Sequence, residues 1–125
     1  MKKLIIKKCL KCGAMVKVIE DCNCENCGIT CCGEPMKEVK ANTSDGAIEK
    51  HKPTYTHKDG KLIVGVDHVM EEDHYIEWLC LLTDTKEEYV YLTPEDEPTY
   101  IFDNVKSGTI YAYCNKHGLW ETEIE

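Results

Sequence analysis

The sequence predicts an all-β protein in which a small cysteine-rich N-terminal domain, held together by a metal, precedes an immunoglobulin-like β-sandwich. Seven of the nine cysteines lie between Cys9 and Cys32, whereas the rest of the chain alternates between short apolar segments and turn residues. No later segment shows a sustained helical period, and about seven short strands in roughly 90 residues are typical of a sandwich. We therefore expect one domain over residues 1–36 and a second over residues 37–125.

The N-terminal domain is too short to bury a stable core without a metal or a partner. Cys9-Leu-Lys-Cys12-Gly is a metal-binding knuckle, and Cys31-Cys32-Gly adds a second pair of thiols. Two close pairs of cysteines predict a four-thiolate site. The domain is therefore expected to fold around Cys9, Cys12, Cys31 and Cys32.

Three further cysteines, Cys22, Cys24 and Cys27, lie between these two pairs. The favoured interpretation is an exposed loop in which none of them is a ligand. The alternatives are a disulfide or redox-sensitive pair, such as Cys22 with Cys27, and exchange into the metal site. The extra thiols would make either ligand exchange or substitution by zinc easier at the four-thiolate site.

In the second domain, runs that alternate between apolar and polar residues predict the strands. They are placed at residues 37–42, 54–57, 61–67, 74–82, 87–92, 99–103, 109–114 and 119–122. Turn residues separate them: a hairpin at Lys58-Asp-Gly60, a second turn at 84–86, and an acidic loop at 94–98.

The predicted hairpin places three histidines together. If the chain turns at Asp59 and Gly60, then His51 and His68 lie at the opposite end of the two strands, and His74 begins the next strand at that same end. The strand pattern does not place Cys114 and His117, which stand three positions apart. A strand that finishes at that end would complete a cluster of four imidazoles and one thiol.

A thiolate among several imidazoles suits iron or copper in redox chemistry at least as well as structural zinc. Zinc in structural sites normally takes four ligands, often as two close pairs. The residues alone therefore leave the metal open.

The charge excludes several classes of partner. The formal charge of −8 argues against nucleic acid and anionic membrane surfaces. No segment approaches the roughly 20 apolar residues of a membrane span, and the basic start of the chain is not a signal peptide. We expect a cytoplasmic protein that has no membrane partner.

Three separated motifs resemble those of the superoxide reductases, in particular the two-iron desulfoferrodoxins. They are Glu49-Lys50-His51-x-Pro53, His68-x-Met-Glu-Glu-x-His74-Tyr-Ile-Glu-Trp78 and Cys114-Asn-x-His117-Gly-Leu-Trp120. The cysteine-rich front, Cys9-x-x-Cys12 with Cys31-Cys32-Gly-Glu-x-Met36, also matches. The resemblance covers nearly the whole chain.

The resemblance implies a catalytic iron with four equatorial imidazoles and an axial thiolate. These ligands would be His51, His68, His74, His117 and Cys114. The ferrous centre would reduce superoxide by one electron to hydrogen peroxide, with uptake of two protons. In the family, the lysine matching Lys50 attracts superoxide, and the glutamate matching Glu49 can contact the oxidised iron.

At the front, the resemblance implies a desulforedoxin-like domain. A second iron there, replaceable by zinc, would be held by the four cysteines and would transfer electrons. A rubredoxin-like donor and a homodimer are implied as well.

Two other functions compete with superoxide reduction. One is an iron protein for electron transfer or redox sensing that has no significant turnover. The other is a zinc-stabilised structural module, against which four imidazoles plus a thiolate argue, because they exceed what tetrahedral zinc needs.

Overall fold

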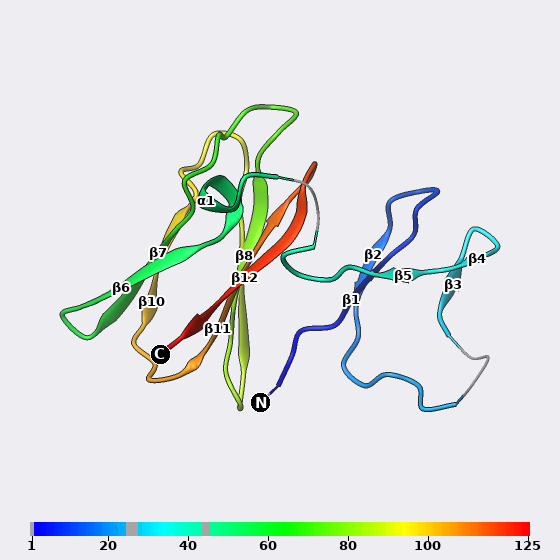
Figure 1. The fold of residues 1–125 in the computed structure, drawn as a ribbon, viewed down its shortest axis with the longest axis horizontal. Helices are drawn as coiled ribbons and strands as arrows, with labels where there is room; N and C mark the ends of the chain where they lie inside the picture. The colour runs from blue at the N-terminus through cyan, green and yellow to red at the C-terminus, as the bar shows by residue number, and fades with distance from the viewer. Residues whose placement is uncertain (1, 25–27, 44–45) are drawn as a thin grey trace. The chain divides into compact units, whose positions relative to one another are not determined.

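The structure is a computed structural model that describes residues 2–24, 28–43 and 46–125 of the 125-residue chain, apart from the side chain of Glu49. Contacts divide the chain into two compact units, one over Lys3–Lys40 and the other made chiefly of Ala41–Glu125. Figure 1 shows that strands dominate both units, which confirms the all-β class. The functional domain limits at residues 1–36 and 37–125 stay a prediction.

The first unit contains only very short strands. A three-stranded sheet has the order β2-β1-β5, and β3 pairs with β4 as a separate hairpin. The strands are β1 (Ile6–Lys8), β2 (Met15–Lys17), β3 (Thr30–Cys31), β4 (Glu34–Pro35) and β5 (Lys37–Glu38). The predicted strand at 37–42 is thus shorter than expected, and it pairs with β1 rather than with the sandwich.

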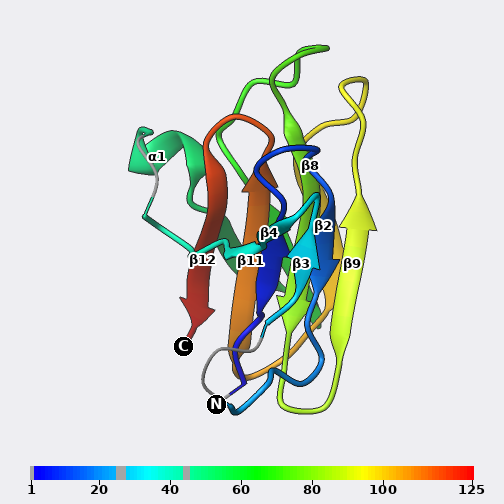
Figure 2. The same cartoon turned by 90° about the vertical axis from the view of Figure 1, so that its right-hand side faces the viewer.

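The second unit is the expected sandwich of seven antiparallel strands. One sheet has the strand order β10-β7-β6 and the other has the order β12-β11-β8-β9. The four strands of the second sheet lie in a row in Figure 2. The strands are β6 (Thr54–Lys58), β7 (Lys61–Gly65), β8 (Ile76–Leu82), β9 (Glu87–Tyr91), β10 (Thr99–Asp103), β11 (Gly108–Cys114) and β12 (Gly118–Ile124). A short helix, α1 (Ile48–His51), was not predicted.

The core lies between the two sheets because both present alternating apolar side chains to each other. Leu62 and Val64 of β7 pack in one cluster with Leu79 of β8 and Ile110 of β11, and all four are completely buried. This packing fixes the ends of the strands, from which the loops of the candidate site depart.

The β6–β7 hairpin forms at the predicted turn. Asp59 and Gly60 have φ angles of 51° and 74°, and Lys58 pairs directly with Lys61. Two positive φ angles in a two-residue loop are typical of a type I′ turn, for which Asp-Gly is a preferred sequence. The turn therefore directs the other ends of β6 and β7 toward His51 and His68.

A β-bulge interrupts the pairing of β8 with β11. Tyr113 faces Trp78, but the next residue, Cys114, faces Ile76, so that Glu77 is an extra residue on β8. Trp78 stacks on Tyr113 with ring centroids 5.5 Å apart, whereas Ile76 and Cys114 belong to the core between the sheets. Cys114 and Tyr113 point to opposite faces by ordinary strand alternation, and the bulge lets Ile76 join Cys114 in the core while Trp78 stacks on Tyr113 on the other face.

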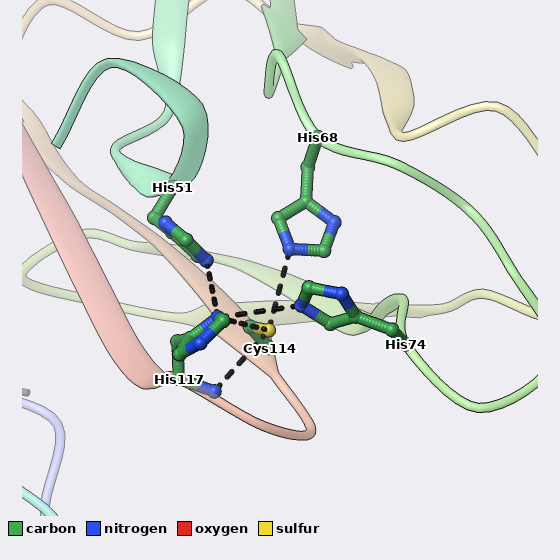
Figure 3. Close-up of side chains that lie close together, drawn as sticks. All are labelled: His51, His68, His74, Cys114 and His117. Carbon is green, nitrogen blue, oxygen red and sulfur yellow. Dashed lines mark hydrogen bonds between the residues drawn. The ribbon is translucent and has the colours of Figure 1, made fainter. Parts of the chain in front are cut away.

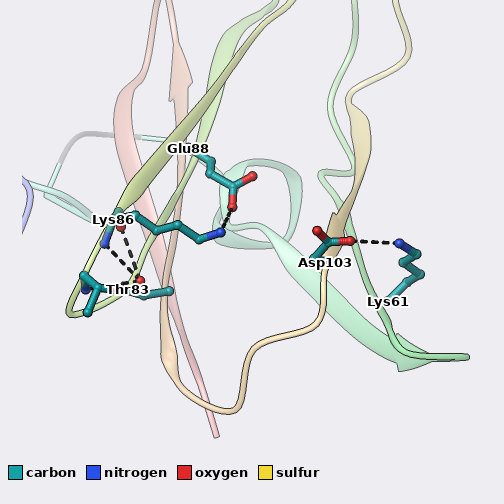
Figure 4. A network of polar contacts seen from close by, with 6 residues as sticks. Lys61, Thr83, Lys86, Glu88 and Asp103 are labelled. Carbon is teal, nitrogen blue, oxygen red and sulfur yellow. Dashed lines mark hydrogen bonds and ion pairs between the residues drawn. The ribbon is translucent and has the colours of Figure 1, made fainter.

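The end of the sandwich that carries the β6–β7 and β8–β9 turns has exposed ion pairs. Lys61 Nζ lies 2.8 Å from Asp103 Oδ1, and Lys86 Nζ lies 2.9 Å from Glu88 Oε1 (Figure 4). The Lys61 ammonium lowers the pKa of the Asp103 carboxyl. Solvent screens such pairs, so they contribute little to the stability of the fold.

No helix within the described ranges is long and apolar enough to cross a membrane.

Gly108, at the start of β11, is required by both its backbone angle and its surroundings. Its φ is +153°, and a Cβ there would lie 2.7 Å from the carbonyl oxygen of Leu82. We expect Gly108→Ala to lower the free energy of unfolding by about 2–4 kcal/mol, because the backbone at Gly108 or Leu82 must move to relieve this contact. Chemical denaturation measures this loss.

Gly60→Ala is the matched control, since its φ is also positive but nothing lies within 4 Å of the added Cβ. A loss at Gly108 no larger than the loss at Gly60 would contradict the proposed steric clash.

Candidate metal centre

Five potential ligands converge at one end of the sandwich (Figure 3). They come from three separate segments: the end of α1, the connection between β7 and β8, and the end of β11 with the turn that follows it. The residues are His51, His68, His74, Cys114 and His117. The predicted convergence is confirmed, including the position of Cys114, which the strand pattern did not determine.

The spacing of the donor atoms fits a single metal ion. All five lie within 4.8 Å of one another. His117 Nδ1 is 2.9 Å from His51 Nε2 and 3.3 Å from His74 Nε2. Two nitrogens that bind a metal at right angles, each about 2.1 Å from it, are about 3 Å apart. The ring nitrogens are thus spaced as neighbouring ligands.

Backbone carbonyls orient two of the imidazoles. His51 Nδ1 lies 2.8 Å from the Ala47 carbonyl oxygen, and His68 Nδ1 lies beside that of Val69. A carbonyl only accepts hydrogen bonds, so each Nδ1 carries the proton and each Nε2 keeps its lone pair for the centre. This tautomer is the one that a metal ligand needs.

The sulfur is enclosed and accepts a backbone hydrogen bond. Cys114 is completely buried, and the main-chain N–H of His117 donates to its Sγ over 3.3 Å. Sγ also lies 3.3 Å from His68 Nε2. A thiolate stabilised in this way can bind a metal while solvent is excluded from it.

Two further residues pack against the ligands. Trp120 donates its indole N–H to the His117 carbonyl over 3.1 Å, and its ring stacks on His51 at 5.1 Å. At Gly46, a Cβ would lie 3.1 Å from His51 Cε1. Sequence reasoning missed Gly46, because nothing in its neighbourhood marks this close approach.

Two of the imidazoles, those of His68 and His117, favour the neutral state. Burial is the main cause that lowers the pKa of both, and the neighbouring His51 and His74 lower it further. Protonation of one ring disfavours protonation of its neighbours, because their charges repel. Neutral rings are the metal-binding form of histidine.

The two predicted catalytic residues precede His51 on α1. Lys50 is exposed to solvent. The side chain of Glu49 lies outside the described part of the structure, so contact between Glu49 and iron stays a prediction, as does the role of Lys50.

A second group of donors lies in the first unit. The sulfurs of Cys9, Cys12, Cys31 and Cys32 are within 4.8 Å of one another. Cys31 Sγ lies 3.6 Å from Cys12 Sγ and 3.9 Å from Cys32 Sγ. Four thiolates arranged tetrahedrally about 2.3 Å from a metal are about 3.8 Å apart, so this group also fits one ion.

The thiols of this group influence each other's ionisation. Backbone N–H groups of Cys12 and Lys11 lower the pKa of Cys9 to about 7. The neighbouring Cys12 thiol is the main cause that raises the pKa of Cys31 to about 12. The group therefore resists holding several negative charges unless a cation compensates for them.

The extra cysteines behave in part as expected. Cys22 is an exposed free thiol, and Cys24 is exposed and disulfide-bonded. Neither belongs to the four-thiol group. The suggested pairing of Cys22 with Cys27 is wrong, because Cys22 is free; Cys27 lies outside the described residues.

Comparisons with known proteins agree with this geometry. The profile of the Desulfoferrodoxin family matches residues 43–123. A desulfoferrodoxin from Nitratidesulfovibrio vulgaris is 43% identical over 123 residues, 94% of each chain. One from Clostridium acetobutylicum is 44% identical over 99 residues, 77% of this chain and 79% of that one.

Among solved structures, the superoxide reductase from Treponema pallidum aligns with a TM-score of 0.73 and 26% identity, covering 97% of this chain and 99% of that one. A one-iron superoxide reductase from Giardia intestinalis aligns with a TM-score of 0.56 and 28% identity, covering 62% of this chain and 98% of the other. Sequence and structure agree: this chain belongs to the desulfoferrodoxin family.

Proposed function

We propose that this protein is a superoxide reductase, which converts superoxide to hydrogen peroxide at an iron ion held by His51, His68, His74, His117 and Cys114. The convergence of four ring nitrogens and one buried sulfur within 4.8 Å supports this proposal most directly. Such a mixed set suits iron, since imidazole and thiolate are both among its usual ligands. When bound, ferrous iron supplies the single electron that superoxide needs.

The protein's own residues hold the ligands in the form that the reaction requires. The Ala47 and Val69 carbonyls fix the tautomers of His51 and His68. The His117 N–H moderates the electron donation of the Cys114 thiolate by bonding to its sulfur. Such partners of the ligands influence both metal affinity and redox potential.

Lysines beside the ligands counteract the charge of the whole protein. A net charge of −8 repels superoxide at long range. Lys50 directly precedes His51 and Lys116 directly precedes His117, and both are exposed. We assign Lys50 the role of attracting superoxide by its local positive potential, and Glu49 the role of a contact to the oxidised iron.

The four-cysteine group would hold a second iron that transfers electrons, since four thiolates leave no position for substrate. Its spacing is equally compatible with zinc. The electron donor would be a rubredoxin-like protein, the assembly a homodimer and the compartment the cytoplasm.

Superoxide consumption by the iron-loaded protein tests the function. With a reductant present, we expect one hydrogen peroxide for each superoxide and no release of oxygen, because the reaction is a reduction rather than a dismutation. Oxygen release would contradict reduction. Iron that is bound but unreactive with superoxide would instead favour electron transfer or redox sensing.

Replacement of Cys114 tests the sulfur ligand. Cys114→Ser should remove one thiolate-to-iron absorption band of the oxidised protein, because a hydroxyl oxygen does not produce it. A difference spectrum against the wild type cancels the contribution of the four-cysteine group. Cys22→Ser, which changes an exposed free thiol, is the control and should keep every band. Survival of the band in Cys114→Ser would rule out this ligand.

Replacement of Lys50 tests the electrostatic role. Lys50→Ala should lower the second-order rate of superoxide capture by about 10-fold and weaken its dependence on salt, because a local positive charge is lost. Lys61→Ala, at the opposite end of the sandwich, should leave the rate unchanged. Stopped-flow or pulse-radiolysis kinetics measures both variants, and equal rates for the two would refute the role of Lys50.

A further inference from the structure

Asn115 joins the two loops that carry four of the five proposed ligands. It directly follows Cys114 and lies two residues before His117. The opposite loop, between β7 and β8, carries His68 and His74. The residue therefore occupies a place from which it can set the relative position of the two loops.

The Asn115 side chain bonds on both sides of His74. Its Oδ1 accepts from the Tyr75 N–H over 3.0 Å, and its Nδ2 donates to the Asp73 carbonyl oxygen over 3.0 Å. Its backbone N–H also donates to the Tyr75 carbonyl over 3.3 Å. One residue thus satisfies three backbone groups that flank a single proposed ligand.

The backbone of His74 itself is bonded on the other side. His74 and Glu71 exchange two hydrogen bonds, of 2.9 and 3.1 Å. His74 thus forms an isolated β-bridge with Glu71, and the residues on either side of it, Asp73 and Tyr75, are bonded to Asn115. The β8–β11 ladder ends with the pair Cys114 and Ile76. Beyond this pair, the side-chain amide of Asn115 forms hydrogen bonds to the opposite chain of the kind that further backbone groups would form.

We propose that Asn115 is a positioning residue that holds the His74 imidazole in the metal-binding arrangement. Without the amide, the backbone of residues 73–75 would keep two sets of hydrogen bonds to described residues: the bond from the Asn115 N–H to Tyr75 and the exchange with Glu71. The ion pair between Lys116 and Asp73 spans the same loops at 4.0 Å, but both side chains are more than half exposed. Solvent screens that pair, so it is a poor substitute for two directional hydrogen bonds.

The inference rests on the proposed metal centre, and Co(II) titration of the 125-residue chain tests it without any measurement of activity. Ligand-field bands of Co(II) at a site of histidines and cysteine differ from those at four cysteines, so each site can be followed separately. Asn115→Ala should weaken Co(II) binding at the histidine site by about 10- to 100-fold. Asn104→Ala, which removes an amide bonded to His57 outside the centre, should not.

A double-mutant cycle separates positioning of His74 from a general structural role. In a His74→Ala background, which keeps three imidazoles and the thiolate, Asn115→Ala should have little further effect on Co(II) affinity. In a His51→Ala background the loss should persist. A loss that persists without His74, or equal affinities for Asn115→Ala and the wild type, would overturn the inference.

If Asn115→Ala fails to fold, Asn115→Asp provides the test, because it keeps an acceptor for the Tyr75 N–H but replaces the donor to the Asp73 carbonyl with a charged oxygen that repels it. It should weaken Co(II) binding, again only while His74 is present. A wild-type chain that binds no Co(II) at the histidine site would overturn the proposed centre and this inference together. Absence of superoxide consumption with normal Co(II) binding would overturn the function alone.

Discussion

The main constraint on this fold is that five electron-pair donors must lie close together at one end of the sandwich. Four ring nitrogens and a sulfur lie within 4.8 Å of one another, and burial together with repulsion between the rings lowers the pKa of His68 and His117. Carbonyl partners fix the tautomers of His51 and His68 in which a lone pair faces the centre. The fold therefore presents a preorganised group of four ring nitrogens and one sulfur, which a metal cation can occupy.

The sandwich supplies the rigidity that this cage requires. Completely buried side chains such as Leu62, Leu79 and Ile110 pack the two sheets against each other. This packing fixes the strand ends from which the ligand-bearing loops depart. Regular alternation along β11 directs Cys114 toward the core, and the bulge at Glu77 brings Ile76 beside it while Trp78 and Tyr113 stack on the other face. In the first unit the strands have two or three residues each, so a metal at the four cysteines has a larger share in holding the chain together.

Much of this arrangement could be predicted from sequence. Alternating apolar residues indicated the sandwich strands, and Asp59-Gly60 identified the hairpin that brings His51 and His68 to one end. Family motifs, rather than periodicity, added Cys114. The helix α1 was missed because four residues carry no helical period. The side-chain hydrogen bonds of Asn115 and the close approach of the His51 ring to Gly46 depend on tertiary contacts, for which the local sequence contains no signal.

Anomalous diffraction at the iron edge, from crystals of the iron-loaded protein, would identify the metal and its ligands at this site. We expect an iron peak bonded to Nε2 of three histidines, to Nδ1 of His117 and to Sγ of Cys114. The three that use Nε2 are His51, His68 and His74. A zinc ion with only four of these ligands, or iron bound outside this cluster, would contradict this expectation.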